Sequence, residues 1–260
     1  MIIKPIIMEW LIELLPDDVT LLQALILIGV AGFTSALTAA IGIGGGLILL
    51  AVMTTLFPVS VAIPVHGVLQ LGSNAGRAIL QWRHVDRSIL LWIALGGLLG
   101  TVSGAQIIVE IAEAPLKIGV AIFVLLSVWG PKIKIPKPGA KTFFATGAVG
   151  AFLTLFFGAT GPIVASVLGR TGLDRFTIVA THGGAMVIQH SFKIIAFGFL
   201  GFSYAQWLPV MVAALSFGFI GTKIGLKFLT KLPEQRFRDI FKITLTLIAF
   251  YLILAAARGI

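Results

Sequence analysis

Residues 61–82 read VAIPVHGVLQLGSNAGRAILQW, and residues 177–198 read TIVATHGGAMVIQHSFKIIAFG. In both stretches polar side chains interrupt an apolar run at helical spacing, and His66 lies 116 residues before His182. Each stretch is long enough to cross a bilayer as a helix. Polar and ionisable groups inside a membrane are costly unless they face protein or water. The repeated polar stripe therefore predicts two related membrane helices that line a functional site.

The same offset of 116 residues relates further positions along the chain. It joins Gly42 with Gly158, Gly45 with Gly161, Gly67 with Gly183, and Arg77 with Lys193. Such a period indicates an internal repeat. We expect five membrane segments in each half, at residues 20–41, 46–57, 61–82, 88–109 and 115–130, and then at 142–157, 160–169, 176–198, 205–223 and 237–257.

The composition indicates a polytopic, all-α membrane protein. Hydrophobic residues make up 58% of the chain and charged residues 11%, and apolar segments recur along it. The net charge of +9 comes mainly from short connections between these segments. Positive-inside topology explains that charge better than a nucleic-acid partner does. The chain has no cysteine, which excludes disulfides and thiolate metal sites.

The charges of the connections predict an inverted arrangement of the two halves. Lys and Arg gather in 82–88, 131–142 and 223–238, which we place in the cytoplasm, whereas the acidic amino-terminal flank, 110–114 and the uncharged 199–205 belong outside. The basic 82–88 and the uncharged 198–204 are equivalent in the repeat and lie on opposite faces. Both termini are expected outside. The expected parts are an amphipathic interfacial segment at 1–18, a first repeat at 19–130, a basic linker at 131–141 and a second repeat at 142–260.

Two expected segments, 46–57 and 160–169, are too short to cross a bilayer comfortably. We expect each to form one arm of a helical hairpin, and each follows a glycine-rich turn. Helices that begin there would expose backbone N–H groups, which favour an anion. The alternative is that the small residues only let helices pack closely. The candidate binding residues at the turns are Gly44, Gly45, Gly46, Thr160 and Gly161.

The two polar stripes supply the other candidate residues. They are His66, Gln70, Asn74 and Arg77 in the first half, and His182, Gln189, His190 and Lys193 in the second. Arg77 and Lys193 lie inside expected spans that hold no Asp or Glu, so an anion is the natural partner. One alternative is that both side chains snorkel to the membrane surface. For the histidines, which could bind an oxyanion or carry a proton, the alternative is a hydrogen bond between helices.

The ordered motifs resemble those of the TauE/SafE family of sulfite and organosulfonate exporters. The resemblance covers residues 20–258 and rests on Gly-Ile-Gly-Gly-Gly at 42–46, Gly-Ala-Thr-Gly-Pro at 158–162 and Trp-Arg-His-Val-Asp at 82–86. The chain departs from the family pattern at Leu47–Leu50, where no proline follows the first turn, and at Val65–Gly67, which usually reads Thr-Ser. A substrate other than sulfite therefore stays open.

The resemblance implies a secondary transporter in the inner membrane that exports sulfite or an organosulfonate, and we expect it to work by alternating access. The alternatives are an anion channel or a carrier for another small oxyanion or carboxylate. An enzyme is disfavoured because we find no nucleophile motif and no His-Glu-x-x-His metal motif. We expect no cofactor and no metal. The expected partners are the sulfur anion, the lipid bilayer and, as an open alternative, further copies of the chain.

Overall fold

The structure of the chain is a computed structural model that describes residues 13–41, 44–108, 111–130, 138–228 and 234–258. Within these ranges the regular elements are ten α-helices and a short 3-10 helix, and there is no strand. The expected all-α class is confirmed. The helices are α2 (Leu21–Ile41), α3 (Gly45–Leu56), α4 (Val59–Leu80), α5 (Arg87–Ile108), α6 (Glu113–Trp129), α7 (Ala140–Phe157), α8 (Gly161–Leu168), α9 (Arg175–Phe199), α10 (Tyr204–Phe228) and α11 (Glu234–Arg258), and η1 (Trp82–His84) follows α4.

Each of the ten segments expected from the sequence corresponds to one helix. The largest difference is at α10, which continues to Phe228 although its apolar run ends at Lys223. Lysine favours a helix, so Lys223 does not end α10, and its ammonium lies over the Phe219 ring, 4.5 Å from the centroid. The expected interfacial segment lies outside the described residues as far as residue 12, and so does most of the linker, residues 131–137.

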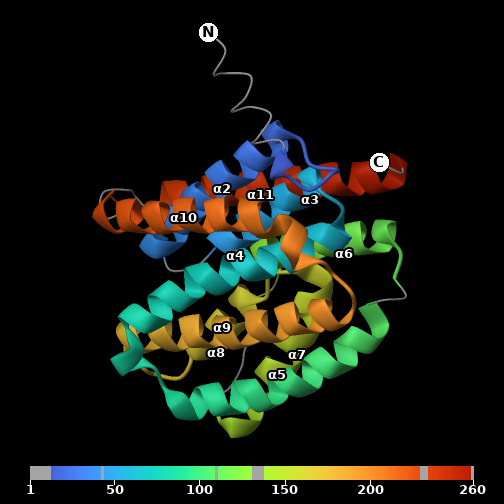
Figure 1. Cartoon of the computed structure of the whole chain (residues 1–260). Helices are drawn as coiled ribbons and strands as arrows, with labels where there is room; N and C mark the ends of the chain where they lie inside the picture. Colours follow the sequence, from blue (N-terminus) through green and yellow to red (C-terminus); the bar gives the residue numbers. More distant parts are fainter. Residues whose placement is uncertain (1–12, 42–43, 109–110, 131–137, 229–233, 259–260) are drawn as a thin grey trace.

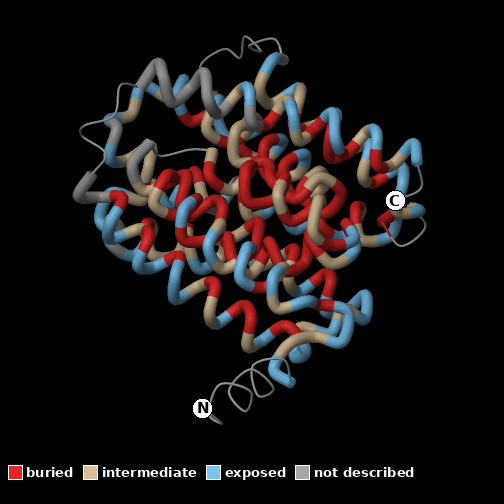
Figure 2. The backbone as a smooth tube through the Cα atoms, turned by 90° about the horizontal axis from the view of Figure 1, so that it is seen from above, coloured by how far each residue is buried: buried red, intermediate tan, exposed pale blue. Residues whose placement is uncertain are grey.

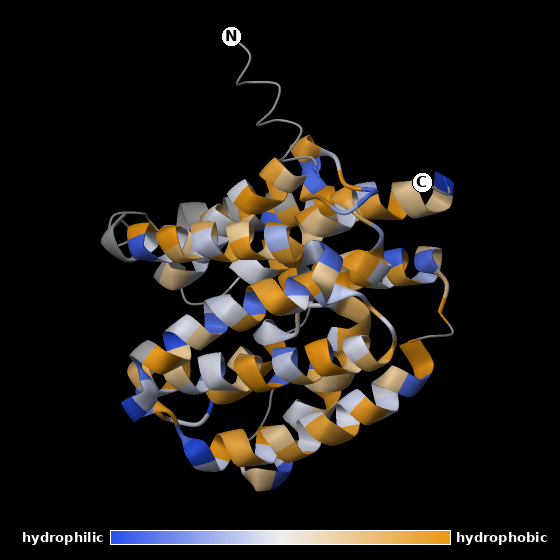
Figure 3. Ribbon diagram, in the orientation of Figure 1, coloured by the Kyte–Doolittle hydropathy of each residue, from blue (hydrophilic) through white to orange (hydrophobic). Residues whose placement is uncertain are grey.

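Four helices in the described part of the chain are long and apolar enough to cross a bilayer. They comprise Leu21–Ala39, Arg87–Ile108, Ala140–Phe157 and Tyr204–Gly225. Large apolar side chains on these helices are exposed, such as Leu91 and Leu98 on α5 and Phe217 and Ile220 on α10. Figure 3 shows apolar residues along the outer helices. Apolar surfaces of this extent are typical of a membrane interface, so the chain is a multi-pass membrane protein.

The helices form two groups around a buried centre. In Figure 1, α2, α3, α10 and α11 lie together at the top, and α5, α7, α8 and α9 lie together at the bottom. Each group combines helices from both halves of the sequence. Figure 2 shows the buried backbone gathered at the centre, with exposed positions around it.

Glycines allow the outer helices of each group to pack backbone against backbone. A Cβ added at Gly100 on α5 would lie 1.9 Å from the carbonyl oxygen of Ala148 on α7. A Cβ added at Gly221 on α10 would lie 2.0 Å from the carbonyl oxygen of Gly32 on α2. Such contacts are typical of small-residue packing in membranes. This packing leaves α4 and α9, which carry the polar stripes, in contact at the centre.

Candidate functional site

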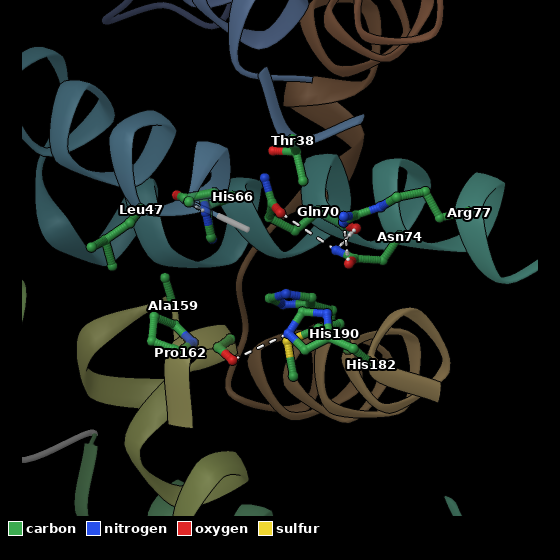
Figure 4. Close-up of a pocket in the computed structure, with 14 residues that line it drawn as sticks. Thr38, Leu47, His66, Gln70, Asn74, Arg77, Ala159, Pro162, His182 and His190 are labelled. Atoms are coloured by element: carbon green, nitrogen blue, oxygen red, sulfur yellow. Dashed lines mark hydrogen bonds between the residues drawn. The ribbon is translucent and has the colours of Figure 1, made fainter. Parts of the chain in front are cut away.

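A small cavity lies between α4 and α9, at the beginnings of α3 and α8. Its volume is about 40 Å³, enough for a few water-sized groups because one water needs roughly 10–15 Å³ of such space. The residues that line it are Thr38, Gly44, Gly46, Leu47, His66, Gln70, Asn74, Arg77, Ala159, Gly161, Pro162, His182, Met186 and His190. Figure 4 shows the α4 residues on one side of this space and the histidines of α9 on the other.

The structure brings most of the candidate residues to this one cavity. Those that line it are Gly44, Gly46, His66, Gln70, Asn74, Arg77, Gly161, His182 and His190. The four candidates that do not line it are Gly45, Thr160, Gln189 and Lys193. Gly45 begins α3, and the Thr160 hydroxyl donates to the Gln189 side chain. Lys193 contacts His66. The cavity therefore combines groups from both halves of the chain.

On the α4 side, three polar residues form a chain of hydrogen bonds. Arg77 Nη2 donates to Asn74 Oδ1 over 2.6 Å, and Asn74 Nδ2 donates to the carbonyl oxygen of Gln70 over 2.7 Å. Asn74 is 2% exposed and Arg77 is 9% exposed. A buried guanidinium is costly to desolvate, and this hydrogen bond to Asn74 offsets part of that cost while Arg77 lines the cavity.

Two of the three histidines at the cavity are bonded to backbone carbonyls. His66 Nε2 lies 2.8 Å from the carbonyl oxygen of Gly46, and His182 Nε2 lies 3.1 Å from that of Gly161. A carbonyl only accepts, so Nε2 carries the proton in both rings and Nδ1 is the acceptor in the neutral form. Each histidine thereby connects its polar stripe to the first turn of a short helix.

The third histidine, His190, has a different environment. Its ring centroid lies 5.9 Å from that of His66, with the planes at 77°. His190 is 3% exposed, and within the described part of the chain its Nδ1 has no hydrogen-bond partner. The same holds for Nε2 of Gln189, whose Oε1 accepts from Thr160 Oγ1 over 2.9 Å. Buried polar atoms generally have a partner, so His190 Nδ1 has the capacity for one further hydrogen bond.

The two glycine-rich turns place the beginnings of two helices at the cavity. Gly44, at the start of α3, has φ 114°, a left-handed conformation that favours glycine. At the start of α8, Pro162 occupies the first turn, where its missing N–H is not needed. The first N–H groups of a helix have no partner within the helix and carry partial positive charge. Both turns thus direct positive dipole ends toward the same space.

Lys193 is completely buried next to the cavity. Its Nζ donates to the carbonyl oxygen of Gly158 over 3.0 Å and lies 3.5 Å from His66 Nδ1. The second contact agrees with Nδ1 of His66 being an acceptor. The side chain is 0% exposed. Lys193 therefore connects His66 to the second glycine-rich turn through these two contacts.

The sequence did not identify five of the residues that line the cavity. They are Thr38, Leu47, Ala159, Pro162 and Met186. Two signals could have found some of them. Thr38 matches Thr154 at the repeat offset, and Met186 occupies the position equivalent to Gln70. Ala159 and Pro162 lie in the second glycine-rich turn, where Pro162 is equivalent to Gly46, whereas Leu47 carries no comparable signal.

Comparison with known proteins identifies the family. The profile described as "Sulfite exporter TauE/SafE" matches residues 25–252, which cover all or part of each of the ten helices. No curated protein and no solved structure matches the chain. The family consists of membrane transporters, so the protein is a transporter and not an enzyme. With a match over most of its length, the chain belongs to the sulfite exporter TauE/SafE family.

Proposed function

We propose that the protein exports a small sulfur oxyanion from the cytoplasm and binds it in the cavity between α4 and α9. The observation that carries this proposal is the set of donors at one place: the Arg77 guanidinium, the beginnings of α3 and α8, and the ring of His190. None of the described residues that line the cavity is acidic. Such a set matches the oxygens of an anion.

The size of the cavity favours a small inorganic anion. A volume of about 40 Å³ suits a sulfur atom with three oxygens better than a sulfonate with an organic substituent. In this proposal Arg77 supplies the charge, and His190 Nδ1 donates to one oxygen when protonated. His66 and His182 keep the two helix starts in position through their bonds to Gly46 and Gly161.

We further propose that the two halves are inverted repeats. The helix contacts support this proposal. Helix α5 packs on α7, and α10 packs on α2, and these two pairs exchange under the 116-residue offset. The four apolar spans also form two equivalent pairs, α2 with α7 and α5 with α10. A repeat of this kind, with a site where the halves meet, is recurrent among secondary transporters.

In this architecture α2 with α3, and α7 with α8, act as helical hairpins that end at the cavity. Both pairs are in contact. Helix α3 has 12 residues and α8 has 8; at about 1.5 Å per residue neither would cross a core of about 30 Å. The halves at 19–130 and 142–260, joined by the basic linker 131–141, would then be the two units of the transporter.

Export by alternating access is consistent with the direction of the membrane potential. From the positive-inside rule we infer that the 82–88 end of α4 faces the cytoplasm. Because the cytoplasm is negative, each negative charge that leaves gains about 2.3 kcal/mol per 100 mV. Transport can therefore proceed without a compulsory cation. A proton carried through His190 would be an addition to this cycle and not a requirement.

Sulfite flux in proteoliposomes tests the proposal. Vesicles loaded with sulfite and containing the purified protein should release it faster than protein-free vesicles, and an inside-negative potential should accelerate release. Arg77→Ala should abolish the difference. Equal release from vesicles with and without protein, for sulfite and for organosulfonates, would reject the substrate class. Unitary currents in a planar bilayer would instead indicate a channel.

A further inference from the structure

A second cavity, of about 490 Å³, lies beyond His66 along α4. Its lining includes Val59, Ser60 and Ile63 on α4, Glu113 on α6, Leu155 on α7 and Phe197 on α9. We call this cavity the vestibule. It is far larger than the central cavity, and the six residues named here do not line the central one.

Three connections meet at the vestibule, and the charge pattern predicts two of them, α5–α6 and α9–α10, on the outer side of the membrane. The α3–α4 connection reaches it at Val59, the α5–α6 connection at Ile111 and the α9–α10 connection at Phe202. The Glu113 carboxylate accepts from the backbone N–H of Val59 and, at 3.4 Å, from that of Ser60, which holds the first two connections together. By the positive-inside rule, we infer that the vestibule opens to the outside.

Lys193 lies next to His66, which lines the central cavity, and one helical turn from Phe197, which lines the vestibule. It lines neither of them. The three residues in its polar cluster are each one helical turn from a residue of the vestibule: His66 from Ile63, Lys193 from Phe197, and Gly158 from Leu155. A Cβ added at Gly67 would lie 2.8 Å from Cε of Lys193, so the lysine stem is tightly enclosed.

We propose that the Lys193 side chain, held by the Gly158 carbonyl and by His66, is the gate between the anion cavity and the vestibule, and that the vestibule is the exit path. This inference rests on the proposed function, since a gate presupposes a transported anion. In the structure the gate is closed.

The chemistry of the gate suits an anion in particular. The two partners of the ammonium, a carbonyl and a neutral imidazole, carry no formal charge. A buried ammonium is stabilised far more by an anion than by neutral acceptors. An anion that moves outward from Arg77 can therefore replace the Gly158 carbonyl as the partner of Nζ. Once the ammonium leaves the carbonyl, the lysine stem can rotate away and open the path.

The absence of cysteine from the chain makes this gate directly testable. In intact cells, a membrane-impermeant thiol reagent should label Ile63→Cys in the vestibule quickly and Met186→Cys in the central cavity slowly. Adding Lys193→Ala should accelerate labelling of Met186→Cys roughly tenfold, because the energy barrier to entry is lowered. Adding Lys193→Met, which keeps the length of the side chain, should leave labelling slow.

Three results would overturn the gate. They are slow labelling of Ile63→Cys, no acceleration by Lys193→Ala, or equal acceleration by Lys193→Ala and Lys193→Met. Melting curves of the purified variants distinguish an opened gate from an unfolded protein, since an opened but folded variant keeps a cooperative transition. Labelling needs no sulfite. If the labelling pattern is as predicted but the protein gives no sulfite flux, the proposed substrate is rejected and the proposed gate stands.

Discussion

Gly45 and Gly161 occupy equivalent positions in the two halves and begin equivalent helices, yet their surroundings differ. A Cβ added at Gly45 would lie 2.1 Å from both the carbonyl oxygen of Thr34 and the hydroxyl of Thr38. A Cβ added at Gly161 would meet nothing closer than His182 Nε2, at 3.5 Å. Gly45 is packed tightly against its own hairpin partner α2, whereas Gly161 borders the cavity. The halves thus share a layout but divide the structural and binding roles unequally.

Alanine at these two glycines should separate the roles most clearly. Gly45→Ala should destabilise the protein by at least about 3 kcal/mol, because backbone atoms of α2 must move. Gly161→Ala should change stability by no more than about 1 kcal/mol, since the contact is ordinary and alanine favours a helix. Melting temperatures in detergent measure both effects. Equal losses of stability would show that the two turns are constrained alike.

The histidines extend the comparison to the polar stripes. His66→Ala should cost about 1–3 kcal/mol more than His190→Ala, because the Gly46 carbonyl and the Lys193 ammonium each lose a hydrogen-bond partner. In the described part of the chain, His190 Nδ1 has no hydrogen bond that His190→Ala could remove. Both changes remove an imidazole ring, so the destabilisation from the cavity left behind is similar. Chemical denaturation without substrate measures the difference, and a larger loss for His190→Ala would contradict the assigned roles.

The hydrogen bond between the start of α8 and α9 should contribute less to stability than the bonds of His66. Thr160→Val removes the hydroxyl that donates to Gln189 Oε1 and should cost about 1 kcal/mol. Thr146→Val is a suitable control, because the Thr146 hydroxyl donates only to the Thr142 carbonyl in its own helix, over 2.7 Å. Melting temperatures should fall more for Thr160→Val. The opposite order would indicate that the α8–α9 bond is not formed.

The smallest expected effect concerns how α4 and α9 begin. The side chain of Asp174, the residue before α9, caps that helix. The equivalent residue before α4 is Pro58, which has no side-chain acceptor, so Glu113 of α6 caps α4 instead. The Thr177 hydroxyl, which donates to the carboxylate over 2.6 Å, and the backbone N–H groups hold the pKa of Asp174 below its ordinary value.

A lowered pKa gives this cap a defined pH dependence. The stabilisation is fully present above the ordinary Asp pKa of about 3.9 and is lost as the pH falls through the lower folded-state value. Asp174→Asn should remove this part of the acid sensitivity and change little at neutral pH, because asparagine also caps helices. Melting temperatures measured from neutral to acidic pH test this. Parallel curves for both proteins would contradict it.

The sequence predicted the positions of the helices well because membrane helices are long apolar runs, and each run ended at charges, glycine or proline. It predicted less about contacts between elements. His66 bonds to Gly46, whereas His182 bonds to Gly161, the equivalent of Gly45. This shift by one residue depends on how each short helix is rotated, which no local pattern encodes. The repeat offset alone therefore could not predict the two bonds.

Lys193 illustrates the same limit at the site. Its spacing from His182 and Gln189 placed it on the polar face of its helix, but a long side chain can turn in several directions. The structure turns it toward the Gly158 carbonyl, away from the space that Arg77 borders. Two residues matched in the sequence thus acquire different surroundings, because the partners come from different helices.

The most direct test of the central claim, that an anion binds between α4 and α9, is thermal stabilisation of the purified protein by sulfite, sulfate, thiosulfate, sulfoacetate and chloride. A ligand that binds the folded state raises its stability by mass action. We predict an increase in melting temperature with sulfite above that with chloride, and its loss in both Arg77→Ala and His190→Ala. An undiminished increase in both variants would place the anion elsewhere and contradict the account.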